Sequence, residues 1–306
     1  MNLYWPVYKN LEKELLVLSN QIHFDDHQLT VYSVKISDLL IRCSVEIESL
    51  AKDLFLANGG TLPTDQDLYF DTDCLELLEN LWGLSSKQVL VVAQTFFFAD
   101  GDNQVLTPLK KANKRGTSGS DWKRAYQAVK HNRTHSLAKG NLKHLIRAMA
   151  ALYLLNIYHK DDRFDLGNDS SASSFDERLG SEIFSVKLHA NSSIAVDGTY
   201  AKKQDFDECV YISNATDETA KSVRESMQKM EEKQKELTTN HFLKTIEAEL
   251  KKGAEFTAEN AHSKIEEIVK AEKEKIGSKF LAQAARSEHT NFKNLKYEAM
   301  VNKNQF

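Results

Sequence analysis

Cysteine, proline and glycine are all scarce in this chain of 306 residues, which contains 3 cysteines, 3 prolines and 12 glycines. So few prolines and glycines argue against a β-sandwich with many turns and favour a fold built mainly from helices. The cysteines (Cys43, Cys74 and Cys209) are scattered and form no CxxC pair. This spacing excludes a CxxC-type zinc site and is typical of a reducing compartment.

Long apolar runs are also absent. No segment approaches the roughly 20 apolar residues that a transmembrane helix requires, and the first residues lack the pattern of a signal peptide. The sequence contains neither a Walker loop nor a dinucleotide fingerprint. We therefore expect a cytoplasmic protein with no membrane segment, no cofactor and no bound metal.

Apolar residues recur at helical spacing through residues 1–160, which we expect to form one helical bundle. Asn58-Gly59-Gly60 should end the second helix, because glycine readily adopts the left-handed conformation that closes a helix. The segment Ser85 to Phe98 is apolar enough for a buried helix, although Val89 to Val92 leaves a strand open. The expected helices span Leu11–Ile22, Val31–Ala57, Cys74–Trp82, Ser85–Phe98, a helix starting at Ser120 or Asp121, and, after a break around Ser136 to Gly140, Leu142–Ile157.

The rest of the chain divides into two parts. Residues 161–215 are expected to form a linker and a small antiparallel β element, with strands at 182–190, 194–196 and 209–212. Residues 216–306 are charged and helical, with apolar positions such as Val223, Met230, Ile265 and Phe280. They predict a helical hairpin, or else an arm that dimerises or binds a partner protein. The expected fold is thus mainly α, with an N-terminal bundle (1–160), a small β element (161–215) and a C-terminal helical arm (216–306).

Acidic residues are almost missing from residues 107–147, which hold eleven lysines and arginines and one acid, Asp121, in a chain of net charge −4. A basic segment on an acidic protein favours an anionic partner there. Arg124 and His131 are seven residues apart and so share a helix face. Histidine can transfer a proton near neutral pH, and a guanidinium can hold a phosphate and stabilise its developing charge. RNA cleavage without metal needs these two roles, because the 2′-hydroxyl can serve as nucleophile.

The stretch Trp122-Lys-Arg-Ala-Tyr-Gln-Ala-Val-Lys-His-Asn-Arg133 resembles the HEPN-like helical bundles of bacteria, in particular a branch with a Trp-x-x-x-Tyr-x-x-x-Lys-His-x-Arg signature. The resemblance extends over roughly Leu29 to Tyr158. It implies an HEPN-like bundle and a metal-independent endoribonuclease of a defence or toxin–antitoxin system. Such proteins usually act as dimers with two copies of an Arg-x4–6-His motif, so a homodimer is implied as well.

Arg124, six intervening residues and His131 match that motif, although Ala125 stands where the family usually has a polar residue. In this hypothesis His131 is the general acid or base, Arg124 and Arg133 hold the scissile phosphate, and Lys130 assists. Either Glu46 or Glu48 could orient His131. The residues expected to contact RNA are Lys110, Lys111, Lys114, Arg115, Tyr126, Asn132 and His135.

The same residues also allow non-catalytic interpretations. Arg124 and His131 can belong to an ordinary solvated helix face, and Tyr126 can pack inward with Trp122. The whole bundle can also be a non-catalytic sensor or scaffold that binds nucleic acid, or a partner protein through the C-terminal helices. A small-nucleotide site would use the same cations.

Overall fold

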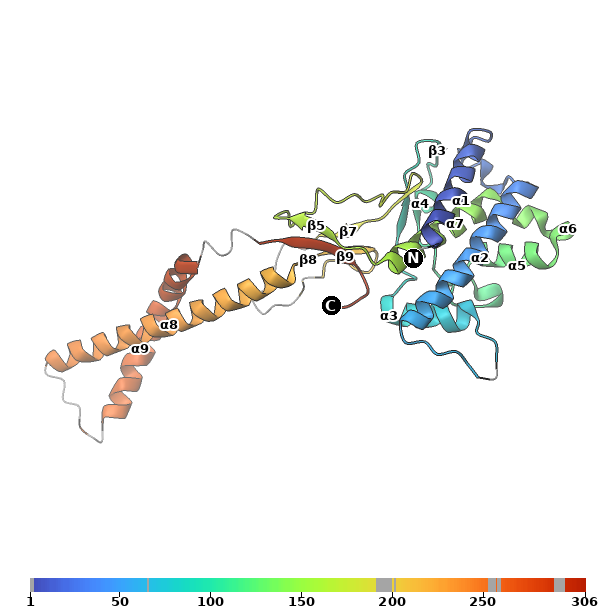
Figure 1. The fold of residues 1–306 in the computed structure, drawn as a ribbon. Coiled ribbons are helices and arrows are strands. Elements are labelled where there is room, and N and C mark those ends of the chain that lie inside the picture. Colours follow the sequence, from blue (N-terminus) through green and yellow to red (C-terminus); the bar gives the residue numbers. More distant parts are fainter. Residues whose placement is uncertain are drawn as a thin grey trace. The chain divides into compact units, whose positions relative to one another are not determined.

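The computed structural model describes residues 3–64, 66–190, 200, 202–252, 257, 260–288 and 295–306. These residues form two units, one of 1–214 with 298–306 and one of 215–297. The chain is mainly helical with small sheets, as expected (Figure 1). Residues 161–214 belong to the first unit, and the last nine residues return to it. No described helix is apolar over a length that could cross a bilayer.

Four helices of the first unit lie side by side (Figure 1). They are α1 (Tyr4–Ser19), α2 (Val34–Ala57), α5 (Asp121–His131) and α7 (Leu142–Lys160). Helix α7 contacts the other three and is buried along most of its length, in keeping with its apolar sequence. The remaining helical segments are η1 (Gln28–Thr30), η2 (Phe70–Leu75, a π-helical turn), α3 (Glu76–Trp82), α4 (Gly101–Gln104), η3 (Gly116–Ser118), α6 (Arg133–Ser136) and η4 (Leu137–Lys139).

The helix boundaries follow from local chemistry. Ser33 caps α2 by accepting a hydrogen bond from the Ile36 backbone N–H, and Gly59, at φ +90°, follows its end as expected. The break after α5 is confirmed: α6 and η4 lie between α5 and α7. Ile22 lies beyond the end of α1.

The expected helix over Ser85 to Phe98 is wrong. That segment contains β2 (Val89–Val91) and β3 (Phe96–Phe97). Its apolar, β-branched run pairs antiparallel with β4 (Val105–Leu106) and β6 (Phe184–Ser185), which come from distant parts of the sequence. Strand β3 pairs with β1 (Phe24–Asp25).

The expected antiparallel β element also needs correction. The segment 182–190 contains two strands, β6 and β7 (Leu188–His189), which belong to different sheets. Strand β7 pairs in parallel with β8 (Tyr211–Ala215), in a four-stranded sheet completed by β5 (Phe164–Gly167) and β9 (Tyr297–Val301). The strand expected at 194–196 lies outside the described residues.

A buried carboxylate joins this region to the bundle. Glu12 on α1 is fully buried and accepts hydrogen bonds from the hydroxyls of Tyr8 and Ser181 and from the backbone N–H groups of Glu182 and Ile183. Because a buried charge without partners is very unfavourable, these donors fix the segment 181–183 against α1.

The second unit is a helical hairpin of α8 (Asp217–Lys251) and α9 (Ala261–Glu288), which pack on each other. The His241 ring bonds to Glu272 at 3.1 Å, Nε2 to Oε2, and these residues lie equally far from the connection, as in an antiparallel pair. At the open end, the Thr216 N–H donates to the Lys296 carbonyl at 3.0 Å.

Candidate functional site

Helix α5 has a buried face and a charged face. Trp122, Tyr126 and Val129 are almost completely buried, and the Trp122 indole N–H donates to the Pro108 carbonyl at 2.8 Å. This packing turns Arg124 and His131 outward, and both are exposed. The sequence pattern alone predicted this orientation, because residues seven apart share a face.

The four expected catalytic residues differ in their contacts. His131 lies at the end of α5, and its Nε2 is 3.2 Å from the Gln127 side-chain oxygen. Arg133 forms an ion pair with Asp38 of α2, and the Lys130 ammonium lies over the Tyr126 ring, 5.2 Å from its centroid. Arg124 forms no ion pair with any described residue. Gln127, not Glu46 or Glu48, is therefore the side chain that holds His131.

The four cations expected in the preceding loop also divide into two pairs. Lys110 and Lys111 are exposed and form no ion pair with the part of the chain that is described. Lys114 pairs with Glu76 at 3.3 Å. Arg115 pairs with Asp71 at 2.9 Å and stacks on the Tyr69 ring, 3.7 Å from its centroid. Lys110 and Lys111 can therefore bind a ligand without breaking an ion pair to a described residue, whereas Lys114 and Arg115 cannot.

The expectation that Tyr126 contacts a base is wrong. Its side chain is fully buried because it lies on the inward face of α5, and burial raises the pKa of its hydroxyl. The Asn132 side chain accepts from the His135 N–H and caps α6, and the residue is exposed. His135 is exposed.

Lys123 was not selected by the sequence analysis, although this residue holds the basic loop against α5. Its side chain is 4% exposed, and its ammonium lies 3.1 Å from Asp71 and 2.8 Å from the Ala112 carbonyl. It also donates to the Lys114 carbonyl. Lys123 therefore fastens the basic loop to α5 from beneath. A lysine in a basic segment carries no sequence signal for this inward position.

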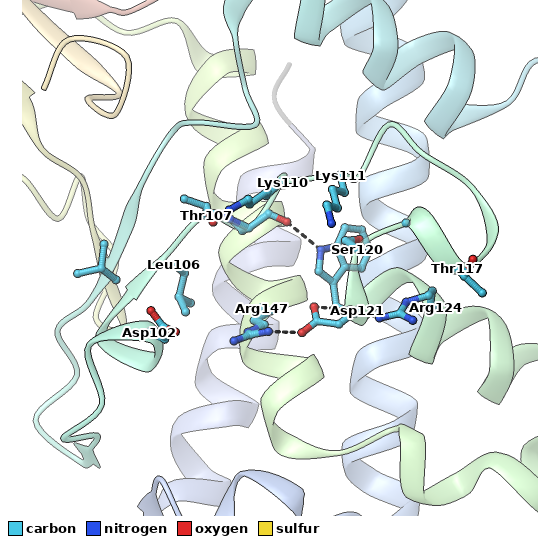
Figure 2. A pocket seen from close by; sticks show the side chains of 14 residues that line it. Asp102, Leu106, Thr107, Lys110, Lys111, Thr117, Ser120, Asp121, Arg124 and Arg147 are labelled. Carbon is cyan, nitrogen blue, oxygen red and sulfur yellow. Dashed lines mark hydrogen bonds and ion pairs between the residues drawn. The ribbon is translucent and has the colours of Figure 1, made fainter. Parts of the chain in front are cut away.

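A cavity of about 380 Å³ lies at the start of α5, and we call it the Ser120 cavity. In Figure 2, Arg147 of α7 meets Asp121 on one side, and Lys110 and Lys111 lie on the other. Ser120, 7% exposed, forms part of its wall. The lining residues are Asp102, Val105, Leu106, Thr107, Pro108, Lys110, Lys111, Thr117, Gly119, Ser120, Asp121, Trp122, Arg124 and Arg147.

A second cavity, of about 930 Å³, lies beyond Arg124, and we call it the Tyr69 cavity. Tyr69, Phe70 and Leu62 give it an apolar wall, whereas Lys130 and Glu48 are among its charged residues. Arg124 lines both cavities; His131 lines neither. The exposed charged face of α5 therefore adjoins two hollows, one basic and one partly aromatic.

One group of described residues has the side chains of a metal site: His189, Asp205 and Cys209. The two ring nitrogens of His189 already have partners, Asp205 Oδ1 at 2.8 Å and the Lys203 N–H at 3.5 Å. The Cys209 thiol donates to Asp205 at 3.6 Å. Hydrogen bonding within the chain therefore accounts for this cluster. Asp205 and Cys209 are four residues apart, whereas His189 comes from strand β7, a pairing that motif spacing does not reveal.

Comparison with known proteins identifies no relative: no family model matches the chain, and no curated protein or solved structure is significantly similar to it.

Proposed function

We propose that this chain is an HEPN-like, metal-independent endoribonuclease that binds RNA along α5 and the basic loop before it. The observation that carries the proposal is the exposure of Arg124 and His131 on one face of α5. Arg124 also shares a cavity with Lys110 and Lys111, which form no ion pair with the described residues. A phosphodiester backbone binds such a surface through charge, and its affinity falls steeply with salt.

In the proposed reaction the His131 imidazole removes the proton of a 2′-hydroxyl. The 2′-oxygen then attacks the adjacent phosphorus, the bond to the 5′-oxygen breaks, and the His131 imidazolium of this copy or of the second copy in the homodimer gives a proton to that oxygen. The products are a 2′,3′-cyclic phosphate and a 5′-hydroxyl. The Arg124 guanidinium neutralises charge on the phosphate as it develops.

Arg124 and His131 are seven positions apart on the helix, which corresponds to about 10 Å along the axis. Within one chain they therefore lie nearer to neighbouring phosphates than to the same one. The homodimer implied by the resemblance would bring a second α5 to the scissile phosphate. Arg133 can join if RNA displaces Asp38, since an exposed ion pair of this kind contributes only about 0–1 kcal/mol.

The test is cleavage of RNA by the full chain in EDTA. We expect His131→Ala to lower the rate by roughly 10²–10⁴-fold, and its thermal stability to stay unchanged because the side chain is exposed. His262→Ala is the control, since His262 is 91% exposed on α9 and far along the chain from α5. Absence of wild-type cleavage, or equal rates in wild type and His131→Ala, would refute the proposal.

A second candidate function is a scaffold that binds a partner protein through α8 and α9. It is favoured by Leu243, Leu250, Ile265 and Leu281, which are large apolar side chains exposed on the hairpin. Because Thr216 and Lys296 are hydrogen-bonded, residues 217–295 can be replaced by a short linker without removing β9. Loss of partner binding with RNA cleavage retained would assign docking to the hairpin; retained partner binding would exclude it.

A further inference from the structure

The Ser120 cavity carries an excess of positive charge. Lys110, Lys111 and Arg124 line it and form no ion pair with the described residues, whereas Arg147 is neutralised by Asp121. Asp102 is the only other carboxylate in the wall. A cavity with this balance favours a dianion.

Ser120 supplies a hydrogen-bond donor that the fold leaves unused. It occupies the N-cap position of α5, where a serine side chain ordinarily accepts a backbone N–H. Here it makes no cap, and the Asp121 carboxylate accepts the Trp122 N–H at 2.8 Å instead. The Ser120 hydroxyl is buried and has no hydrogen-bond partner among the described residues. An unpaired buried hydroxyl is unfavourable. Because Ser120 lines the cavity, rotation of this hydroxyl about the Cα–Cβ bond would let it donate to an anionic oxygen there.

The helix itself adds to this preference. Asp121 and Trp122, the first residues of α5, line the cavity. With 11 residues α5 is long enough to have a helix dipole, and the positive end of that dipole lies at the cavity. Backbone N–H groups and the helix dipole at such an end favour phosphate.

The loop on the other side is held in place. Lys111 has φ +62°, a left-handed conformation that is unfavourable for a residue with a side chain. Its carbonyl accepts from the N–H groups of Ser120 at 3.2 Å and Lys114 at 3.1 Å. Lys111 is therefore fixed beside Ser120 before any ligand arrives.

The size of the cavity and its apolar wall indicate more than a bare ion. About 380 Å³ falls within the range of small-molecule sites, roughly 300–1,000 Å³. Val105, which is 36% exposed, supplies apolar surface beside the cations. An organic group attached to the anion would contact this surface.

We propose that the Ser120 cavity binds a phosphate monoester of a nucleotide, either free or at the end of a nucleic-acid chain. This inference depends on the proposed ribonuclease function only because the end of an RNA chain is one source of a phosphate monoester. Binding at Ser120 requires no cleavage and no contribution from His131.

The test is calorimetric titration of the full chain with adenosine 5′-monophosphate, with adenosine and inorganic phosphate as comparison ligands. The nucleotide contains no phosphodiester bond, so the result is readable whether or not the protein cleaves RNA. We expect the nucleotide to bind and adenosine not to bind. Loss of one charge-assisted hydrogen bond in Ser120→Ala should raise the Kd about tenfold, and Lys111→Gln should raise it as well.

The matched control is Ser118→Ala, because Ser118 is an exposed serine of the same loop outside the cavity wall. It should bind as wild type does. Ser120→Ala should melt at the wild-type temperature or above, since it removes an unpaired buried hydroxyl. If Ser120→Ala fails to fold, Arg124→Gln replaces it, because Arg124 is exposed.

Equal binding of adenosine and the nucleotide would overturn the proposal, as would no binding at all or wild-type affinity in Ser120→Ala. A short DNA oligonucleotide with or without a 5′-phosphate, which cannot be cleaved through a 2′-hydroxyl, distinguishes the two sources. A preference for the phosphorylated end that Ser120→Ala removes would identify a chain end as the ligand. Binding of the free nucleotide alone would identify a small nucleotide.

Discussion

Replacing Asp71 with alanine should destabilise the first unit strongly, because it removes the carboxylate that pairs with the buried Lys123. The Asp71 and Lys123 side chains are 8% and 4% exposed, and their charged atoms lie 3.1 Å apart. Arg115 approaches the same carboxylate from the more exposed side. In Asp71→Ala the Lys123 ammonium keeps its two backbone carbonyls but loses its counter-charge.

Breaking a buried ion pair by removing one partner typically costs about 3–5 kcal/mol. Burial already lowers the pKa of Lys123, so the lysine can escape part of this cost by losing its proton. Burial alone would raise the pKa of Asp71, but hydrogen bonds from Arg115, the Thr72 N–H and Lys123 hold it below its ordinary value. Its contribution is therefore complete above about pH 4 and is lost as the pH falls through the lower pKa of the folded state.

The assay is urea denaturation followed by circular dichroism at pH 7, on wild type, Asp71→Ala, Lys123→Met and the double variant. Glu76→Ala is the matched control, because Glu76 pairs with Lys114 of the same loop but both side chains are exposed. It should cost at most about 1 kcal/mol. The double variant should be less destabilised than the sum of the single variants. Equal losses in Asp71→Ala and Glu76→Ala would refute the reasoning.

Three further predictions concern stability. Gly140→Ala should destabilise the protein by about 1–3 kcal/mol, because the new Cβ would lie 2.3 Å from the Ser37 hydroxyl oxygen. Gly101→Ala is the control and should be neutral or slightly stabilising, because open space surrounds Gly101. Equal urea midpoints for the two variants would contradict the prediction. Lys87 is 2% exposed and burial lowers its pKa to about 8, so Lys87→Met should raise the free energy of unfolding at pH 7, by at most roughly 3 kcal/mol. That advantage should shrink as the pH rises from 8 towards 10, because the folded lysine then loses its proton while the unfolded lysine still keeps its own. Identical unfolding curves at pH 7 would exclude this prediction. Burial lowers the pKa of His144, although its hydrogen bond to the Lys139 carbonyl opposes this effect. Stability should therefore fall as the pH drops below about 6.5, because the unfolded histidine gains a proton before the folded one. The same fall in His144→Gln would show that His144 is not the cause.

Much of the helical bundle could be predicted without coordinates. The apolar spacing of residues 34–57 and 142–160, the stop at Gly59 and the break after His131 depend on contacts within one helix or at its ends. The outward position of Arg124 and His131 follows from the same periodicity. The apolar run at Val89 was ambiguous, because a short buried segment looks alike as helix or strand until its pairing partners are known.

The sequence by itself determined which segments form helices and where basic side chains concentrate, because spacing and capping act over a few neighbouring residues. Only the tertiary structure decided which cations pair with an acid. Arg133, Lys114 and Arg115 each meet an acid more than thirty residues away, whereas Lys110, Lys111 and Arg124 form no ion pair within the described part of the chain. It also decided that Tyr126 is buried, and that Ser120 lies in the wall of a cavity with a hydroxyl that no described residue bonds. These outcomes depend on the path of the chain between distant segments, and no local pattern encodes that path.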